Sequence, residues 1–94
     1  GEDGLIVVVT TIDGTSGEIV AGPDIISRGF VYVREAEDML SEARAIAKQT
    51  VQDCVGGRMR DWGNIKTQVR DALSSYFYGR TKRSPMILPV IQEV

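Results

Sequence analysis

The run LIVVVTTI at residues 5–12 constrains the fold of this chain more than any other segment. Its β-branched residues favour an extended strand, and eight residues are too few for an apolar helix of ordinary length. Apolar and polar residues do not alternate along it: one face would carry Leu5, Val7 and Val9, and the other Ile6, Val8 and Ile12. A strand with this pattern is expected to be covered on both faces.

A second run of the same kind, MILPVI at residues 86–91, lies near the other end of the chain. It places Met86, Leu88 and Val90 opposite Ile87 and Ile91. Proline has no N–H to donate to a neighbouring strand, so Pro89 predicts a sheet edge or a bulge. Because both faces of both runs are apolar, the pattern leaves open which face of each strand meets the core.

The segment after the first run predicts a hairpin. DGTSG at residues 13–17 is typical of a turn, and residues 18–21 would return as the second strand. Gly22-Pro23-Asp24 is expected to interrupt that strand. The pattern FVYV at residues 30–33 then predicts a short strand, or a continuation with a bulge.

Two segments with helical spacing follow. Residues 35–55 place acidic side chains in the first turn and apolar or small side chains three and four residues apart, and Gly56-Gly57 predicts a left-handed stop. Asp61 is expected to cap a second helix that ends at Gly79. The stripes are Met39, Leu40, Ala43, Ile46, Ala47, Thr50, Val51 and Cys54 in the first helix, and Trp62, Ile65, Val69, Ala72, Leu73, Tyr76 and Phe77 in the second.

The resulting order is β-β-α-α-β over a single domain of residues 1–94. Two helices can cover one face of a three-stranded sheet, so the fold class is α/β, more narrowly α+β. The second face would remain apolar with no element of the chain to cover it. Either the loop at residues 23–29 folds over that face, or another subunit or domain does.

The composition argues against an enzyme. The chain has no histidine, which removes the usual proton shuttle, the Ser/His and Cys/His nucleophile pairs and every His-containing metal cage. A single cysteine, Cys54, excludes an internal disulfide, and no apolar run approaches the ~18 residues of a membrane span. These features predict an intracellular, non-catalytic domain with no membrane partner. A start at Gly1-Glu2-Asp3 suggests a piece cut from a longer protein.

The net charge of -2 is unevenly distributed. Residues 1–47 carry nine acids and three arginines, a sum of -6, and residues 48–94 carry eight bases and four acids, a sum of +4. The halves could neutralise each other within the fold, attract the opposite half of a second copy, or present a basic strip to a polyanion.

Four cations are candidates for contacts with RNA. Arg28 lies beside Gly29 and could grip a phosphate, although a structural bridge to Asp24 or Glu35 is the favoured interpretation. The others, Arg80, Lys82 and Arg83, lie next to two tyrosines, a combination also found in solvated loops.

Several segments together resemble the C-terminal domain of the ribonuclease J family. They are ISRGFVYVRE at 26–35, Asp61-Trp62, TKRSPMILPVIQEV at 81–94, GLIVVVTTID at 4–13 and the PDIISRGF run that begins at Pro23. The resemblance implies a cytoplasmic bacterial ribonuclease with 5′-to-3′ exonuclease and endonuclease activity. Its metallo-β-lactamase and β-CASP domains would hold two zinc ions and the RNA channel. No residue here inherits a catalytic or zinc-binding role.

What the resemblance implies for this chain is a dimerisation and scaffold role that supports RNA degradation and processing by the parent enzyme. The partner would be a second copy or the parent's catalytic domains, and RNA would be met through the parent. With the strand phase open, the interface candidates are Ile6, Val7, Val8, Ile87, Leu88 and Ile91. A structural role is expected for Gly29, Phe30, Trp62 and Pro85. The alternative is an accessory RNA-binding module.

Overall fold

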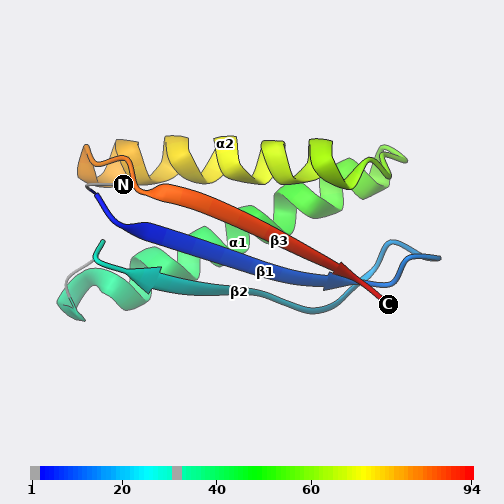
Figure 1. Cartoon of the computed structure of the whole chain (residues 1–94), viewed down its shortest axis with the longest axis horizontal. Helices are drawn as coiled ribbons and strands as arrows, with labels where there is room; N and C mark the ends of the chain where they lie inside the picture. Colours follow the sequence, from blue (N-terminus) through cyan, green and yellow to red (C-terminus); the bar gives the residue numbers. More distant parts are fainter. Residues whose placement is uncertain (1–2, 31–32) are drawn as a thin grey trace.

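The computed structural model describes residues 3–30 and 33–94. The elements in chain order are β1 (Leu5–Ile12), β2 (Ile19–Arg28), α1 (Val33–Gly56), α2 (Trp62–Thr81) and β3 (Met86–Glu93) (Figure 1). The predicted order β-β-α-α-β and the α+β class are therefore confirmed.

The sheet places the first strand in the middle, in the order β2-β1-β3. β1 and β2 are antiparallel because a short turn joins them, in which Asp13 Oδ1 accepts hydrogen bonds from the Thr15 and Ser16 amides at 2.8 and 2.9 Å. β3 is parallel to β1, because the helical hairpin leaves the end of the sheet where β2 stops and returns to that same end, beside the start of β1.

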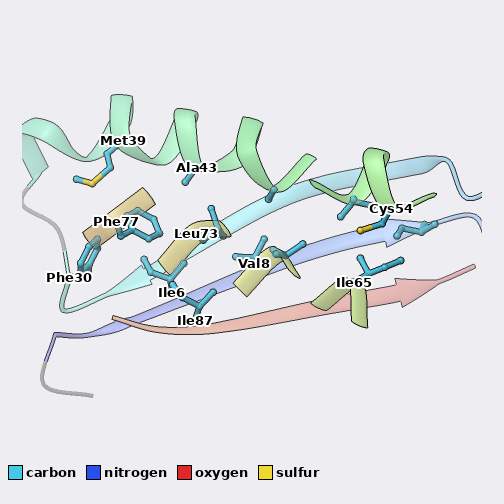
Figure 2. Close-up of a cluster of buried hydrophobic side chains, with 14 residues drawn as sticks. Ile6, Val8, Phe30, Met39, Ala43, Cys54, Ile65, Leu73, Phe77 and Ile87 are labelled. Atoms are coloured by element: carbon cyan, nitrogen blue, oxygen red, sulfur yellow. The ribbon is translucent and has the colours of Figure 1, made fainter. Parts of the chain in front are cut away.

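Both helices cover one face of the sheet. α1 contacts β2, α2 contacts β3, and the helices pack against each other. Figure 2 shows the buried side chains lying between the helices and the strands, with Phe77 and Leu73 of α2 facing Ile6 and Val8 of β1. Burial of these residues is the main stabilising term of the fold.

The segment between β2 and α1 differs from the prediction. β2 does not stop at Gly22-Pro23-Asp24 but continues to Arg28, because register shifts opposite Val9 to Thr11 absorb the irregularity. At the two described ends of the predicted 30–33 strand, Phe30 lies outside any strand and Val33 already belongs to α1. Phe30 is buried on the helix side, edge-on to Phe77 with ring centroids 5.0 Å apart, and α1 begins at Val33. Residues 31–32 lie outside the described residues.

The helix ends also differ in detail. Asp61 caps α2 as predicted, its carboxylate accepting from the Asn64 amide at 3.2 Å. After α1 the left-handed residue is Arg58, with φ 66°, rather than a glycine. α2 continues past Gly79, because Lys82 adopts the left-handed conformation and donates its amide to the Tyr78 carbonyl. Within the described residues, neither helix is long and apolar enough to cross a membrane.

Candidate functional site

The structure decides which face of each strand meets the core. Along β1 buried and half-buried residues alternate, with Ile6, Val8 and Ile12 under the helices. The opposite face of the sheet has no element over it among the described residues, and we call it the open face. Its apolar members are Leu5, Val7, Val9, Ile26, Met86, Leu88 and Val90.

Two of the six interface candidates lie on the open face, namely Val7 and Leu88. The other candidates do not: Ile6, Val8 and Ile87 are buried in the core, and Ile91 is half-buried against it. The helices already cover these four side chains, so they are not available for contact with a partner.

The open face also contains residues that the candidate set lacked. Ile26, Met86, Leu88 and Val90 are 46, 52, 47 and 39% exposed. Met86 and Val90 lie two residues before and after Leu88, on the same face of β3, so the sequence pattern alone could have identified them. Ile26 could not, since its place depends on the register between β1 and β2.

The register arranges the open face in four rows across the sheet, and the last of them, Ala21–Thr11–Gln92, carries no large apolar side chain. The other three rows carry the large apolar side chains. The middle row is Ile26–Val7–Leu88 and is entirely apolar. The outer rows are Arg28–Leu5–Met86 and Asp24–Val9–Val90. Each outer row therefore has one charged residue, on β2, and the charges have opposite signs.

The free edges of the sheet are interrupted by proline. The Met86 amide donates to Gly4 and the Val94 amide to Ile12, so the even-numbered residues of β3 bond to β1. Pro89, opposite Val8, consequently turns its nitrogen to the outer edge. This confirms the prediction of an edge position and removes a donor where another strand would pair.

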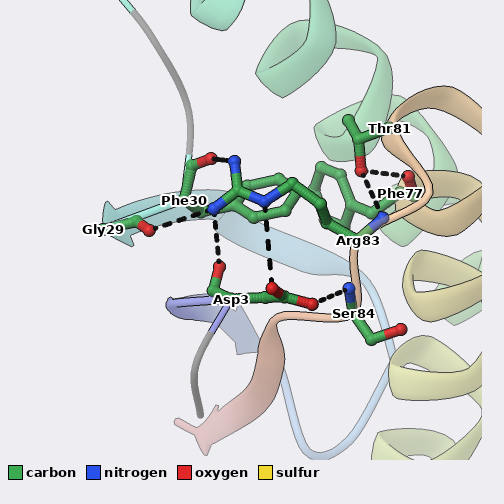
Figure 3. A network of polar contacts seen from close by, with 7 residues as sticks. All are labelled: Asp3, Gly29, Phe30, Phe77, Thr81, Arg83 and Ser84. Atoms are coloured by element: carbon green, nitrogen blue, oxygen red, sulfur yellow. Dashed lines mark hydrogen bonds and ion pairs between the residues drawn. The ribbon is translucent and has the colours of Figure 1, made fainter.

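Arg83, a candidate for RNA contact, is half-buried and contacts several groups of the chain itself (Figure 3). Its guanidinium donates to the Phe30 carbonyl, lies 5.0 Å from the Phe30 ring centroid, and pairs with the Asp3 carboxylate at 4.0 Å. The other oxygen of Asp3 accepts from the Ser84 amide at 2.7 Å. The cation thus joins the starts of β1 and β3 to the end of β2.

Arg80 is also engaged within the fold. Its Nη1 donates to both Glu42 oxygens at 3.2 Å and to the Tyr76 hydroxyl at 2.9 Å, and Tyr76 donates to Glu42 at 2.7 Å. The Tyr76 hydrogen bond, with the charge of Arg80, lowers the pKa of Glu42. Burial and the Glu42 carboxylate raise the pKa of Tyr76. These three side chains fasten α2 to α1.

The remaining two candidate cations, Lys82 and Arg28, are exposed, as Arg80 is, but form no ion pair among the described residues. Lys82 lies 5.1 Å from the Tyr78 ring centroid. Arg28 donates to the Ser27 carbonyl at 3.0 Å and forms no ion pair with Asp24, while the side chain of Glu35 lies outside the described residues. Two of the four candidate cations, Arg80 and Arg83, are thus paired with carboxylates of the chain itself.

The four residues expected to have a structural role lie near the ends of helices and strands or in the core. Gly29 has φ 68°, a conformation that favours glycine, and its carbonyl faces Arg83 at 3.4 Å. Trp62 Nε1 donates to Glu93 at 3.1 Å and ties the start of α2 to the end of β3. Phe30 and Pro85 are buried.

Among the described residues, no group of three or more Asp, Glu and Cys side chains is placed to hold a metal ion. Burial, together with the charge of Asp53, raises the pKa of the Cys54 thiol, which favours its unreactive form.

Comparisons with known proteins agree with the architecture. The family described as the ribonuclease J C-terminal domain matches residues 1–94. The chain is 42% identical to ribonuclease J2 of Bacillus subtilis and 45% identical to ribonuclease J 2 of Staphylococcus aureus, each over 93 residues. Each alignment covers 99% of this chain but only 17% of the relative, so the chain spans about a sixth of these proteins.

Proposed function

The chain belongs to the ribonuclease J C-terminal domain family, and from this premise we propose that it is a non-catalytic association domain whose open face binds a second copy of itself. The observation that carries the proposal is the apolar middle row Ile26–Val7–Leu88, which no described element covers. Removing such a surface from water is the main driving force of protein association.

The face, rather than the edges, is the association surface. Pro89 removes an outward donor from β3, and Pro23, which also lacks an N–H, lies in the irregular part of β2 between Ala21 and Asp24. Strand addition at either edge would meet an interrupted row of donors. Packing of two sheets face to face needs no edge donor and would bury the apolar rows.

The family membership leads us to propose further that this chain is part of a longer ribonuclease J. It would degrade and process RNA in the cytoplasm, with two zinc ions held by domains outside this chain. The association of two copies of this chain would hold the catalytic domains in their active assembly.

The first experiment measures association directly. Sedimentation equilibrium of the chain is expected to show a monomer–dimer equilibrium. Leu88→Asp on β3 and Ile26→Asp on β2 should each shift the equilibrium to monomer. The circular dichroism spectrum of each variant should stay the same as that of the wild type. Tyr78→Asp is the matched control, because Tyr78 is an exposed apolar residue on α2 away from the sheet. A chain that stays monomeric at high concentration, or a dimer unaffected by both variants, would contradict the proposal.

The consequence for the longer protein can be measured separately. Leu88→Asp in a full-length ribonuclease J that contains this chain should produce smaller species and lower RNA turnover. Unchanged assembly and turnover would overturn the scaffold role.

The alternative role, RNA binding by a basic surface, has less support, since Arg80 and Arg83 are held by Glu42, Phe30 and Asp3. Titration with single-stranded RNA at two salt concentrations separates the two functions. Tight, strongly salt-dependent binding that Arg28→Ala and Lys82→Ala abolish would favour the RNA-binding module.

A further inference from the structure

The open face carries a charge pattern that is complementary to itself, and this feature deepens the proposed function, on which it rests. We propose that two copies pack face to face about a two-fold axis that crosses the strands at Val7, with Arg28 of each copy opposite Asp24 of the other. The charged pair would set the orientation, while the apolar rows supply the contact area.

The positions of the two charges come from the register. Arg28 is opposite Leu5, Ile26 is opposite Val7, and Asp24 is opposite Val9. Arg28 and Asp24 are therefore equidistant from Ile26 along the same strand and point to the same face. At about 3.3 Å per residue they are separated by roughly 13 Å, which is too far for an ion pair within one copy.

A face-to-face dimer of identical sheets has two simple orientations, because the two-fold axis between the sheets can run across the strands or along them. An axis across the strands at Val7 places β2 over β2 of the second copy and reverses its direction. Arg28 then lies over Asp24 of the second copy, and Met86 lies over its Val90. Both contacts occur twice, and each joins groups of compatible character.

The second orientation lacks this complementarity. An axis along β1 places β2 over β3 of the second copy, so Arg28 would lie over Met86 and Asp24 over Val90. Each charge would then lose water against an apolar side chain without gaining a partner, which is unfavourable. The charges therefore select the axis across the strands.

The distances allow the contact. Packed sheets are roughly 10 Å apart and rotated by about 30°, a gap that an extended arginine and an aspartate can span together. Because β2 is an edge strand, the pairs lie at the rim of the interface. Rim charges contribute mainly to orientation and to selection against wrong arrangements.

Charge reversal tests this arrangement. Arg28→Asp places two aspartates opposite each other at both ends of the interface, and Asp24→Arg places two arginines there. Each variant alone is expected to weaken the dimer about tenfold or more, as measured by sedimentation equilibrium. An equimolar mixture of the two should form heterodimers about as tight as the wild-type dimer. The double variant with both reversals should recover the homodimer.

The outcomes separate this inference from the proposed function. If the wild-type chain does not dimerise, both fail. If it dimerises through the open face, as shown by Leu88→Asp, but the charge variants bind normally, the association role stands and the proposed axis is overturned. Weakened single variants that do not recover on mixing also overturn the pairing. Circular dichroism of each variant confirms that both exposed positions tolerate the change.

Discussion

A single guanidinium joins three separate parts of this chain. Arg83 contacts Asp3 before β1 and the carbonyls of Gly29 and Phe30 after β2, and it stacks on the Phe30 ring. A lysine at this position would keep the charge but not the planar fork that reaches several acceptors at once. Arg83 is therefore a structural residue at the end of the sheet where all three strands meet.

Removal of this side chain should destabilise the fold. Arg83→Ala leaves the Phe30 carbonyl and the Asp3 carboxylate without this donor, and we expect a loss of about 1–3 kcal/mol in the free energy of unfolding. The control is Arg70→Ala, because Arg70 pairs only with the adjacent, exposed Asp71 and should cost less than about 0.5 kcal/mol. Urea unfolding measures both. Equal effects for the two variants would show that the contacts of Arg83 add nothing.

The Glu42–Tyr76–Arg80 contacts predict a pH dependence. Hydrogen bonding from Tyr76 and the charge of Arg80 lower the pKa of Glu42 below its ordinary 4.5. A carboxylate with a lowered folded-state pKa stabilises the fold above its unfolded pKa, and this contribution is lost as the pH falls through the folded value. Thermal midpoints of the wild type and Glu42→Gln should therefore differ at neutral pH and converge in acid.

A carboxylate without these contacts supplies the comparison. Glu18→Gln changes an exposed residue in the β1–β2 turn, and its difference from the wild type should stay small across the same range. A Glu42→Gln difference that is constant with pH would show that the ion pair contributes no linked stability.

Neither set of contacts could be predicted from the sequence. Glu42 is 38 residues from Arg80, and Asp3 is 81 residues from Ser84. Local spacing identifies cations near aromatic residues, but it does not show which carboxylate or carbonyl the fold brings to them. The sequence therefore does not reveal that Arg80 and Arg83 pair with Glu42 and Asp3.

The elements themselves follow well from local pattern. The helical stripes, the cap at Asp61, the turn at residues 13–17 and the edge position of Pro89 were all predictable, because each depends on neighbouring residues. The phase of β1 and β3 was not, since apolar residues occupy both faces. The length of β2 depends on its pairing with β1, and the burial of Phe30 depends on its contact with Phe77. Both contacts join residues far apart in the sequence, so local pattern does not predict them.

The end of α2 offers a test at the level of one element. Lys82 has φ 58°, a conformation costly for any residue with a β-carbon. Lys82→Gly should therefore stabilise the chain by about 0.5 kcal/mol, whereas Lys66→Gly in the interior of α2 should destabilise it by about 1 kcal/mol. The same substitution thus has opposite signs at two sites of one helix. Chemical denaturation measures both, and destabilisation at both sites would mean that the left-handed cap contributes no strain.

At the scale of the whole molecule, the chain has a one-sided core. Two helices and three strands enclose the residues around Phe77 and Leu73, while the reverse of the sheet keeps an apolar middle row. Two opposite charges flank that row on β2, Arg28 at the end of the strand and Asp24 in its middle. In the proposed dimer, this sheet would be one half of a sandwich, and the second copy would complete the burial.

The proposed dimer would link stability to protein concentration. If only the folded chain dimerises, mass action stabilises it, so the thermal midpoint rises with protein concentration. For a dimer of two 94-residue chains, a hundredfold rise in concentration should raise the midpoint by on the order of 5–10 °C. Leu88→Asp removes the contact without touching the core, so its midpoint should be independent of concentration. Tyr78→Asp should keep the slope of the wild type, because it adds the same charge away from the open face. Differential scanning calorimetry across this range decides the matter: a wild-type midpoint that does not move would mean that the fold is complete without a second copy.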